Sequence, residues 1–595
     1  MPILVQKFGG SSVATAEKIL SAARKAIRAQ QEGYQVVVVV SAMGDNTDLL
    51  IDLAEQITNE PSAREMDMLL STGEQVSVAL MAMAIQRYGH AAISLTGGQI
   101  GIRTDSSFRK ARIRSIATDR LRRLLDAGNI VIAAGFQGID EELNITTLGR
   151  GGSDTTAVAL AAVLDAAACE IFTDVDGVYT TDPRVLPEAR QVAQISYDEM
   201  LELASLGAGV MHNRSIEFAK KFDVPIRVRS SFSDAPGTMI VSQPESASAA
   251  VCGAALTGKE ARLTIQRVAD RPGTSYAIFK CLADRKIDVD MIVQNVASDG
   301  LADISFTVPA GELKESLRAL RAAQDSVGAA GVSVDEDVAK VSAVGLGMSS
   351  QTGVAHRMFS AIAAAGVNLQ MISTSEIKIS VLVARSEGEA ALRAVHQAFD
   401  LQRVPADAST GGDGAGHHTS QNSPEQIIER LQSTDMERLT LTDIAIAEDQ
   451  SRITLVGVPD HPGLAANIFK TIADGGVFVD MIVQSYDGEA EVNNISFTIP
   501  QSQYEQCLGI LKSMPDSGTG VASNRDIAKL SVSGIGLRSH TSVAIAMFEA
   551  LSRESINIQM INTSELRVNV VVDRKDGRRG LQALNEIFRQ FHGAN

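Results

Sequence analysis

The sequence has few cysteines and no long apolar segment. Its 595 residues include only four cysteines, which stand far apart and form no CxxC pair: Cys169, Cys252, Cys281 and Cys507. This usage excludes a disulfide framework and a structural zinc site, and it favours a reducing compartment. No apolar run approaches the roughly 20 residues of a membrane span, and the first residues, MPILVQKFGG, lack the layout of a signal peptide. We therefore expect a cytoplasmic protein without a membrane partner.

Stripes of basic residues are absent as well. The chain carries 54 lysines and arginines against 71 aspartates and glutamates, a formal net charge of −17, which makes nucleic acids and anionic membranes poor partners. Hydrophobic residues (45%) and charged residues (21%) stand at ordinary levels for a globular protein. At roughly 150 residues per domain, the length predicts about four domains.

The first 240 residues alternate strand-like and helix-like segments. The five-valine run Val36–Val40 predicts a central parallel strand that is buried on both faces. Ser196 and Glu199 form a capping-box pattern at the start of a helix. Strands that alternate with helices predict a doubly wound α/β domain. The other expected strands are Pro2–Phe8, Ala91–Leu95 and Ile130–Ala134, and the expected helices include Thr15–Gln31, Glu74–Tyr88 and Arg112–Asp126.

The rest of the chain repeats itself. The string VDMIVQ occurs at Val289 and again at Val479, and NLQMISTSE from Asn368 returns as NIQMINTSE from Asn557. These repeats divide the region into two copies. Within each copy, a phenylalanine followed twelve residues later by a methionine occurs two times. The region therefore contains four units of roughly 80 residues, arranged in two pairs. These positions are Phe279, Phe359, Phe469 and Phe548, followed by Met291, Met371, Met481 and Met560.

A Gly/Ser-rich stretch separates the two pairs. It includes STGGDGAGHHTSQNSP, which cannot bury a core and predicts a linker, with His417 and His418 solvated rather than metal-binding. We number the units 1 to 4. We expect an α/β domain at 1–245, unit 1 at 246–340, unit 2 at 341–403, a linker at 404–440, unit 3 at 441–529 and unit 4 at 530–595.

Each unit reads as strand, turn, helix, two strands and helix, the split βαβ order of ferredoxin-like domains. With a D-x-P-G turn at Asp270–Gly273 and Asp460–Gly463, the units resemble ACT domains, small modules that bind amino acids. A structural dimerisation module is the alternative. The strings GLGMSS from Gly345 and GIGLRS from Gly534 lack the third glycine of a dinucleotide fingerprint, which argues against a dehydrogenase.

Three loops of the first domain carry groups that suit anions. In KFGGSS from Lys7, glycine amides, a helix N-terminus and a lysine come together. GRGGSDTT from Gly149 places an arginine in a glycine-rich turn, where its fork suits a carboxylate or a phosphate. FTDVDGVY from Phe172 adds two carboxylates and an aromatic ring at the end of a buried strand. The first two loops also fit purely structural turns, so each is weak by itself.

Five segments, in this order, resemble the aspartate kinase family of the amino-acid kinase superfamily. They are KFGGSSVA (7–14), STGEQVS (71–77), GRGGSDTTA (149–157), TDVDGVYTTDPR (173–184) and VRSSF (228–232). With the ACT units, the resemblance covers essentially the whole chain. It implies that 1–245 is a catalytic amino-acid kinase domain. Such enzymes transfer the γ-phosphoryl group of ATP to the side-chain carboxylate of L-aspartate, on the route to lysine, threonine, methionine and diaminopimelate.

The resemblance also implies residue roles. Lys7 would stabilise charge on the transferring phosphoryl group, Arg150 would clamp the α-carboxylate of aspartate, and Asp154 would orient the lysine. Mg²⁺ is expected, bound chiefly by ATP phosphates and water. Gly209 departs from many relatives, which carry a lysine near the ATP phosphates. The implied aspartate site is Thr47, Glu74, Arg150, Gly151, Gly152 and Ser153, and the implied ATP site is Lys7, Phe8, Gly9, Gly10, Ser41, Thr173, Asp174, Tyr179, Arg184, Gly209 and Val210.

For the ACT units, the resemblance implies effector sites between the first-helix turn of one unit and a strand of its neighbour. Lysine and/or threonine are the expected inhibitors, and a homodimer through the ACT domains is expected. Each pair has a full set of these parts, so the linker should leave each pair free to fold as its own unit, although one pair could be mainly structural. The implied effector residues are Asp270, Gly273, Ser275, Asp288, Val289, Gln294, Val354, Ala355, Asn368, Leu369, Ser375 and Glu376 in the first pair, and Asp460, Gly463, Ala465, Gln484, Val543, Ala544, Asn557, Ile558, Ser564 and Glu565 in the second.

Three alternatives stay open at this point. Another superfamily kinase could phosphorylate glutamate, carbamate or a nucleotide, although Glu74 and Arg150 suit the two ends of an amino acid and the ACT units fit amino-acid metabolism. A sensor with an inactive kinase layer is a second alternative, opposed by the intact Lys7, Arg150 and Asp154. A scaffold that only forms oligomers is the third, and it would not need the glycine loops.

Overall fold

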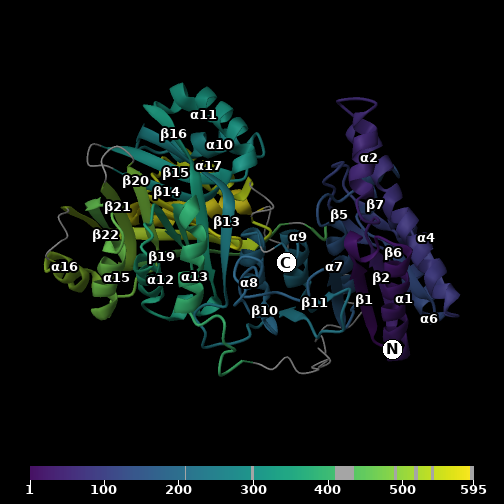
Figure 1. Ribbon diagram of the computed structural model, residues 1–595. Coiled ribbons are helices and arrows are strands. Elements are labelled where there is room, and N and C mark those ends of the chain that lie inside the picture. The colour runs from purple at the N-terminus through teal and green to yellow at the C-terminus, as the bar shows by residue number, and fades with distance from the viewer. Residues whose placement is uncertain are drawn as a thin grey trace.

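The computed structural model describes residues 1–207, 209–296, 300–408, 435–437, 439–487, 492–514, 520–537 and 542–589. Figure 1 shows the N-terminal domain, coloured purple to blue, beside the repeat units, coloured teal to yellow. Most of the expected linker, including His417 and His418, lies outside the described residues.

An eight-stranded sheet organises the N-terminal domain. Its order is β10-β12-β11-β9-β1-β2-β6-β3, and the six strands from β11 to β3 run parallel. All five valines of Val36–Val40 are buried, as the sequence predicts for a central strand. The strands are β1 (Ile3–Phe8), β2 (Gln35–Val40), β3 (Ala92–Leu95), β6 (Ile130–Ala134), β9 (Ala168–Thr173), β10 (Gln194–Ser196), β11 (Ile226–Ser230) and β12 (Thr238–Val241).

Helices cover both faces of this sheet, which confirms the doubly wound α/β prediction. One face packs against α1 (Ala16–Gln31), which Thr15 caps, and α4 (Thr72–Arg87). The other face packs against α7 and its neighbours. The predicted capping box of Ser196 and Glu199 is present at the start of α8. The remaining helices of the domain are α2 (Asn46–Glu55), α3 (Ala63–Leu70), α5 (Gly97–Ile100), α6 (Asp119–Asp126), α7 (Gly152–Leu164), α8 (Tyr197–Ser205) and α9 (Asn213–Phe222).

The predicted helix Arg112–Asp126 is wrong in its first half. Ile113–Ile116 forms β5, the edge of a four-stranded sheet, and only Asp119–Asp126 is helical. Ile113 and Ile116 are buried, and the backbone between them pairs with a neighbouring strand, so tertiary pairing overrides the local helical pattern. The other strands of this sheet are β4 (Ile102–Thr104), β7 (Gln137–Ile139) and β8 (Ile145–Thr147).

The four repeat units share one sheet of twelve strands, in the order β14-β15-β13-β16-β18-β17-β20-β21-β19-β22-β24-β23. Each unit places two helices against its strands, and Figure 1 shows α10, α11 and α17 on one side of the strands and α12, α13 and α15 on the other. The first copy comprises β13 (Gly253–Ala269), α10 (Thr274–Ala283), β14 (Asp290–Val296), β15 (Leu301–Pro309), α11 (Leu313–Val327), β16 (Gly331–Val344), α12 (Val354–Ala364), β17 (Met371–Thr374), β18 (Lys378–Ala384) and α13 (Gly388–Ala398). The second comprises β19 (Thr440–Pro459), α15 (Leu464–Asp474), β20 (Ile482–Asp487), β21 (Val492–Pro500), α16 (Tyr504–Lys512), β22 (Gly520–Ile535), α17 (Ser542–Arg553), β23 (Met560–Thr563), β24 (Arg567–Asp573) and α18 (Arg574–Phe588).

Long strands run through the expected unit boundaries. The boundary at 340 falls inside β16, and the boundary at 529 falls inside β22. Residues 338–344 of β16 pair with β18 on one side and with the first residues of β13 on the other. The sheet of unit 2 therefore includes the first residues of the expected unit 1, an exchange that no local sequence signal reveals.

In addition to the strand pairing within each copy, the units contact one another across the two copies. Unit 1 meets unit 4, where Asn557 Nδ2 donates to Asp270 Oδ1 (3.0 Å) and Gln294 Nε2 donates to the Ile558 carbonyl (3.0 Å). Unit 2 meets unit 3 through the equivalent bonds, from Asn368 Nδ2 to Asp460 Oδ1 (2.9 Å) and from Gln484 Nε2 to the Leu369 carbonyl (3.0 Å). The expectation that each pair folds as its own unit is therefore wrong, because each copy supplies the partner of the other.

The repeated methionines explain this arrangement. Met291, Met371, Met481 and Met560, which occupy equivalent positions in the four units, all lie in one buried cluster. The repeated phenylalanines meet in pairs, with ring centroids 5.8 Å apart for Phe279 and Phe548 and 5.7 Å apart for Phe359 and Phe469. The equivalent methionines of all four units thus pack in one buried cluster, and the equivalent phenylalanines pack in pairs. All four units contribute to this shared core.

Candidate active site and effector cavities

The carboxyl ends of the central strands carry the predicted loops of the N-terminal domain. Because β1, β2, β6 and β9 are parallel, the segments that follow them lie at one edge of the sheet, the usual ligand edge of an open α/β sheet. Hydrogen bonds tie these segments together: Ser41 N donates to the Phe8 carbonyl (3.1 Å), and Gly44 N donates to the Gly10 carbonyl (3.1 Å). The loops that the sequence singles out are therefore neighbours.

A buried ion pair stands at this edge. Lys7 lies near the end of β1, and its Nζ is 2.5 Å from Oδ1 of Asp154 in the first turn of α7. Both side chains are largely buried, so the pair is weakly screened. A lysine beside the N-terminus of a thirteen-residue helix provides strong positive potential for an anion.

Two glycines allow the loops to approach one another. A Cβ on Gly10 would lie 2.9 Å from the Ala42 carbonyl oxygen, so any other residue would push the first two loops apart. Gly151 has a positive φ of 73°, and a Cβ there would lie 2.4 Å from the Cβ of His212. The Gly149–Ser153 loop, which we call the substrate loop, therefore depends on glycine both for its conformation and for its contact with His212.

Glu74 faces the same region from α4. The side chain is buried, and its Oε1 accepts a hydrogen bond from the Ala42 backbone N–H (3.0 Å). Burial raises the pKa of Glu74 to about 7, although the bond from Ala42 opposes the shift. Its other carboxylate oxygen has no hydrogen-bond partner among the described residues. A buried carboxylate with spare acceptor capacity can receive a ligand ammonium group.

Arg150 is exposed, and Ser153 is buried beside Gly135, so the substrate loop offers a cation at its rim and polar groups at its base. Thr47, the remaining predicted aspartate contact, is half-buried at the start of α2. The structure thus gathers the predicted residues around one edge.

Residues that the sequence did not reveal brace the substrate loop. Arg214, in α9, donates to the Leu148 carbonyl (2.5 Å) and to the Ala111 carbonyl (2.6 Å), just before the loop begins. Its guanidinium also forms a bidentate ion pair with Glu437, at 2.6 and 2.7 Å. Met436 beside it is buried in the core of the N-terminal domain. The chain that leads into unit 3 is therefore attached to the base of the substrate loop.

Most of the predicted nucleotide residues lie at or after the ends of β1, β2 and β9. The exceptions are Gly209 and Val210, which lie between α8 and α9. Phe8 and Phe172 stack with ring centroids 4.7 Å apart, and they support the Gly9–Gly10 turn and Thr173. Tyr179 Oη donates to Asp176 Oδ1 (2.9 Å). Asp174, Gly209 and Arg184 are exposed, Val210 is half-buried, and Arg184 forms an ion pair with Asp182 (2.8 Å). Arg184 is thus held at the surface by a carboxylate two residues away.

Three cavities lie between units and contain many of the predicted effector residues. The cavity between units 1 and 4, which we call cavity A, is lined by Asp288, Val289, Asp290, Lys378, Ala544, Ser564 and Glu565, among others. Cavity B, between units 2 and 3, is lined by Asn368, Leu369, Asp460, Gly463, Ala465 and Gln484, among others. Cavity C, also between units 2 and 3, is lined by Val354, Ala355, Ser375, Glu376, Phe478 and Asp480, among others.

The remaining effector predictions fall around the turn of unit 1. Asp270 and Asn557 bond to each other, Ser275 Oγ donates to Gln294 Oε1 (3.3 Å), and Ile558 accepts from Gln294. Gly273 has a positive φ at the start of α10. Val543 is a buried core residue of α17. The predicted turn and strand parts therefore do meet, but across the copies.

The glycine string GLGMSS from Gly345 permits close backbone packing. A Cβ on Gly345 or Gly347 would lie 2.3 Å from a backbone oxygen of residue 250 or 249.

Ala63–Arg87, which comprises α3 and α4, is long and apolar enough to cross a membrane by length and composition, but 56% of its most apolar window is buried, as in a core helix. Among the described residues, no group of three His, Cys, Asp or Glu side chains could hold a metal ion.

Comparison with known proteins agrees with this geometry. The amino acid kinase family model matches residues 2–230, and the ACT domain model matches 266–324, 341–399, 453–514 and 530–588. An aspartate kinase from Stutzerimonas stutzeri is 50% identical over 403 residues, which cover 67% of this chain and 98% of that protein. The crystal structure of aspartate kinase from Synechocystis covers 100% of this chain and 99% of that one, at 39% identity and a TM-score of 0.52. Escherichia coli aspartokinase III in complex with aspartate and ADP covers 67% of this chain and 99% of that one, at 26% identity and a TM-score of 0.57.

Proposed function

This chain belongs to the aspartate kinase family, and on that premise we propose that it transfers the γ-phosphoryl group of MgATP to the side-chain carboxylate of L-aspartate. A carboxylate oxygen attacks the γ-phosphorus, the bond to the ADP oxygen breaks, and 4-phospho-L-aspartate and ADP leave. No general base is needed, because the attacking oxygen is already ionised. The product would open the lysine, threonine and methionine route through diaminopimelate, in the cytoplasm.

The observation that supports this function most strongly is the Lys7–Asp154 pair at the ligand edge of the sheet. Charge develops on the equatorial oxygens of the transferring group, and a cation held in a partly dry site stabilises it without reorganisation. Asp154, 2.5 Å from Lys7 Nζ, fixes the position of that cation. Mg²⁺ arrives with the ATP phosphates, and the described residues supply no carboxylate cluster to hold it.

Aspartate itself is held by its two ends. The Arg150 guanidinium at the rim of the substrate loop would bind the α-carboxylate, and the spare oxygen of Glu74 would accept from the ammonium group. This arrangement leaves the side-chain carboxylate directed towards Lys7. A ligand that carries both an ammonium group and a carboxylate suits this pair, which favours an amino acid over carbamate or a nucleotide.

Initial-rate measurements of ADP formation test the proposal. L-aspartate should support turnover, and L-glutamate, one methylene longer, should support at least about tenfold less, because a pocket discriminates one methylene by roughly 10- to 200-fold. Equal rates with both amino acids, or ADP formation that does not depend on aspartate, would reject the proposed substrate.

Amino-acid effectors are proposed to bind the cavities between units. Escherichia coli aspartokinase III has been solved in complex with lysine and aspartate, and cavity A suits lysine because Asp288, Asp290 and Glu565 line it. In cavity C, Phe478 stands at the repeat position of Asp288, so that carboxylate is missing and a ligand with an uncharged side chain, such as threonine, suits that environment better. Calorimetry with each amino acid and with D288A tests this assignment.

A homodimer stays part of the proposal. The faces through which ACT domains of two chains would pair are already in contact between the two copies of one chain. A dimer of this protein would therefore use a different surface from the one that the sequence alone predicts.

A further inference from the structure

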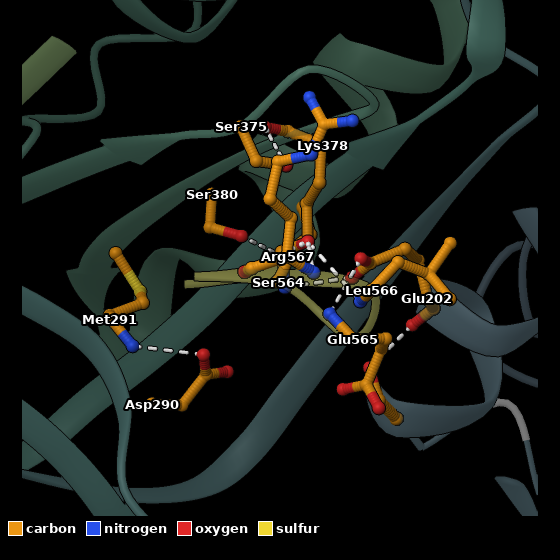
Figure 2. Close-up of polar contacts among 12 residues, drawn as sticks. Glu202, Asp290, Met291, Ser375, Lys378, Ser380, Ser564, Glu565, Leu566 and Arg567 are labelled. Atoms are coloured by element: carbon orange, nitrogen blue, oxygen red, sulfur yellow. Dashed lines mark hydrogen bonds and ion pairs between the residues drawn. The ribbon is translucent and has the colours of Figure 1, made fainter. Parts of the chain in front are cut away.

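Three charged side chains meet where the N-terminal domain touches both copies of the repeat. Glu202 projects from α8, Lys378 begins β18 of unit 2, and Glu565 lies in the turn between β23 and β24 of unit 4 (Figure 2). The Glu202 carboxylate is fully buried. Its Oε2 is 2.9 Å from Lys378 Nζ, and its Oε1 accepts from the Glu565 backbone N–H (3.0 Å). One kinase side chain is thus held by two regulatory units at once.

Lys378 and Glu202 each stabilise the charged form of the other against burial. Burial raises the pKa of Glu202, and the nearby Lys378 opposes that shift. Burial alone lowers the pKa of Lys378, but Glu202, Asp290 and Glu565 together hold that pKa above its ordinary range. A buried carboxylate without its cation is costly, so Lys378 is the reason that Glu202 can stay in this position. The position of α8 therefore depends on a lysine of unit 2.

Glu565 also holds the next helix of the kinase. Its Oε2 accepts from Asn213 Nδ2 (3.0 Å), and Asn213 is the first residue of α9. Glu565 thereby fixes the end of α8 through its N–H and the start of α9 through its side chain. Between these two points the chain includes Gly209 and Val210, which are predicted ATP contacts, and His212, which packs against Gly151 of the substrate loop.

The same side chains form part of cavity A. Lys378 and Glu565 both line it, whereas Glu202 does not. A ligand in cavity A therefore contacts the two groups that hold Glu202 and Asn213. These two groups are bonded to Glu202 of α8 and to Asn213 of α9.

We propose that Glu202, Lys378 and Glu565 form a coupling cluster, in which Glu565 and Lys378 act as positioning residues that set the α8–α9 connection and transmit the occupancy of cavity A to the nucleotide side of the active site. The transmission step rests on the proposed function, because it assumes an amino-acid effector in cavity A. The positioning step does not, and it can be measured without any effector.

The repeat provides a matched control. Arg567 occupies the position of Lys378 in the second copy, and it pairs with Glu376 of unit 2 instead of a kinase residue. K378M and R567M thus remove a cation from equivalent positions, but only K378M leaves a kinase carboxylate buried without its partner. The double variant E202Q/K378M removes both charges and keeps an amide oxygen that can accept from the Glu565 N–H.

Steady-state kinetics without effector test the positioning step on the full chain. We expect K378M to raise the KM for ATP by about tenfold or more, with a smaller change in the KM for aspartate, because Gly209 and Val210 lie in the affected connection. R567M should stay within about threefold of wild type, and E202Q/K378M should return to that range. If K378M lowers only the melting temperature and leaves both KM values unchanged, its role is structural and the positioning step is wrong.

Lysine titrations test the transmission step. Calorimetry should show that E202Q, which lies outside cavity A, binds lysine with a Kd near that of wild type, while the concentration for half-inhibition rises at least about tenfold. Wild-type inhibition of E202Q with intact binding would overturn the transmission step. If wild type itself binds no lysine, the proposed effector is wrong, and the ATP KM comparison alone decides whether the cluster positions the active site.

Discussion

Single residues at the carboxyl edge of the kinase sheet divide the chemistry between charge stabilisation and substrate binding. Lys7 and Asp154 form a partly buried pair, whereas Arg150 stays exposed at the rim. A pre-positioned cation acts mainly on the transition state, and an exposed clamp acts on the ground state as well. The two classes of residue are therefore distinguishable by kinetics.

Removing the cation should impair the chemical step. We expect K7A to lower kcat by roughly 10²–10³-fold, because a group that stabilises transition-state charge is typically worth that much. R150A should instead raise the KM for aspartate most, since the clamp contributes to binding in both states. Circular dichroism and the melting temperature verify folding. Near wild-type turnover in folded K7A would contradict the role of Lys7.

Glu74 predicts a pH dependence with a defined sign. Burial raises the pKa of Glu74 to about 7 in the free enzyme, and only the ionised form pairs with the ammonium group of aspartate. As pH falls below about 7, protonation removes the negative charge, so kcat/KM for aspartate should fall with decreasing pH. The pH profile of kcat/KM from 5.5 to about 8.5 measures this, with E74Q as control, which should be less active and lack this titration.

The sequence indicated Lys7 and Arg150 because each lies in a glycine-rich loop whose chemistry suits an anion, whereas Glu74 was implied by the resemblance to the family. Glu202, Lys378 and Glu565 could not be recognised as a cluster in that way. Glu202 stands among buried helix positions, and its partners lie 176 and 363 residues further along the chain, which only the tertiary fold brings together. Arg214 and Glu437 were missed for the same reason.

At the scale of elements, the substrate loop owes its shape to its packing against α9. Gly151 has a positive φ, and a Cβ added there would clash with the His212 side chain. Gly128 has a similar φ of 81°, but a Cβ added there would have no atom within 4 Å. Alanine substitutions at these two glycines can therefore separate the effect of backbone strain from the effect of the clash with His212.

G128A should cost about 1 kcal/mol of unfolding free energy, the usual cost of placing alanine at positive φ, with unchanged kinetics. G151A carries the same strain and in addition forces His212 away, so we expect the KM for aspartate to rise at least about tenfold. Thermal unfolding and initial rates measure the two effects. Equal kinetics for the two variants would show that contact with His212 does not shape the loop.

The error over Arg112–Asp126 also belongs to this scale. Its spacing of apolar residues suits a helix, yet Ile113–Ile116 pairs with β4 at the edge of a small sheet. The regular α/β alternation was predictable because each element carries its own signal, whereas edge strands depend on the partners that pair with them.

At the scale of the whole molecule, the second copy is an integral part of the enzyme. It contacts units 1 and 2 through the bonds of Asn557 and Asp460. The segment that leads into it places Met436 in the kinase core and pairs Glu437 with Arg214. The match to the aspartate kinase from Stutzerimonas stutzeri covers 67% of this chain and 98% of that protein, so this chain is the longer of the two. Self-comparison of the sequence revealed the duplication, but the exchange of partners between copies needed the structure.

Truncation after Arg403 should therefore leave a kinase that lacks the partners of units 1 and 2. We expect the 1–403 fragment to bind the 435–595 fragment one to one in sedimentation experiments, and to regain wild-type lysine inhibition only in that complex. Failure of the two fragments to associate, combined with wild-type inhibition of 1–403 alone, would contradict the pairing across copies.

The central claim is phosphoryl transfer to the side-chain carboxylate of aspartate at the Lys7 site. Trapping the acyl phosphate with hydroxylamine tests it most directly, because the resulting aspartyl hydroxamate identifies the phosphorylated group. We predict hydroxamate formation that requires both ATP and L-aspartate and falls by roughly 10²-fold or more in K7A. ATP hydrolysis without any hydroxamate, or an undiminished hydroxamate rate in folded K7A, would contradict the account.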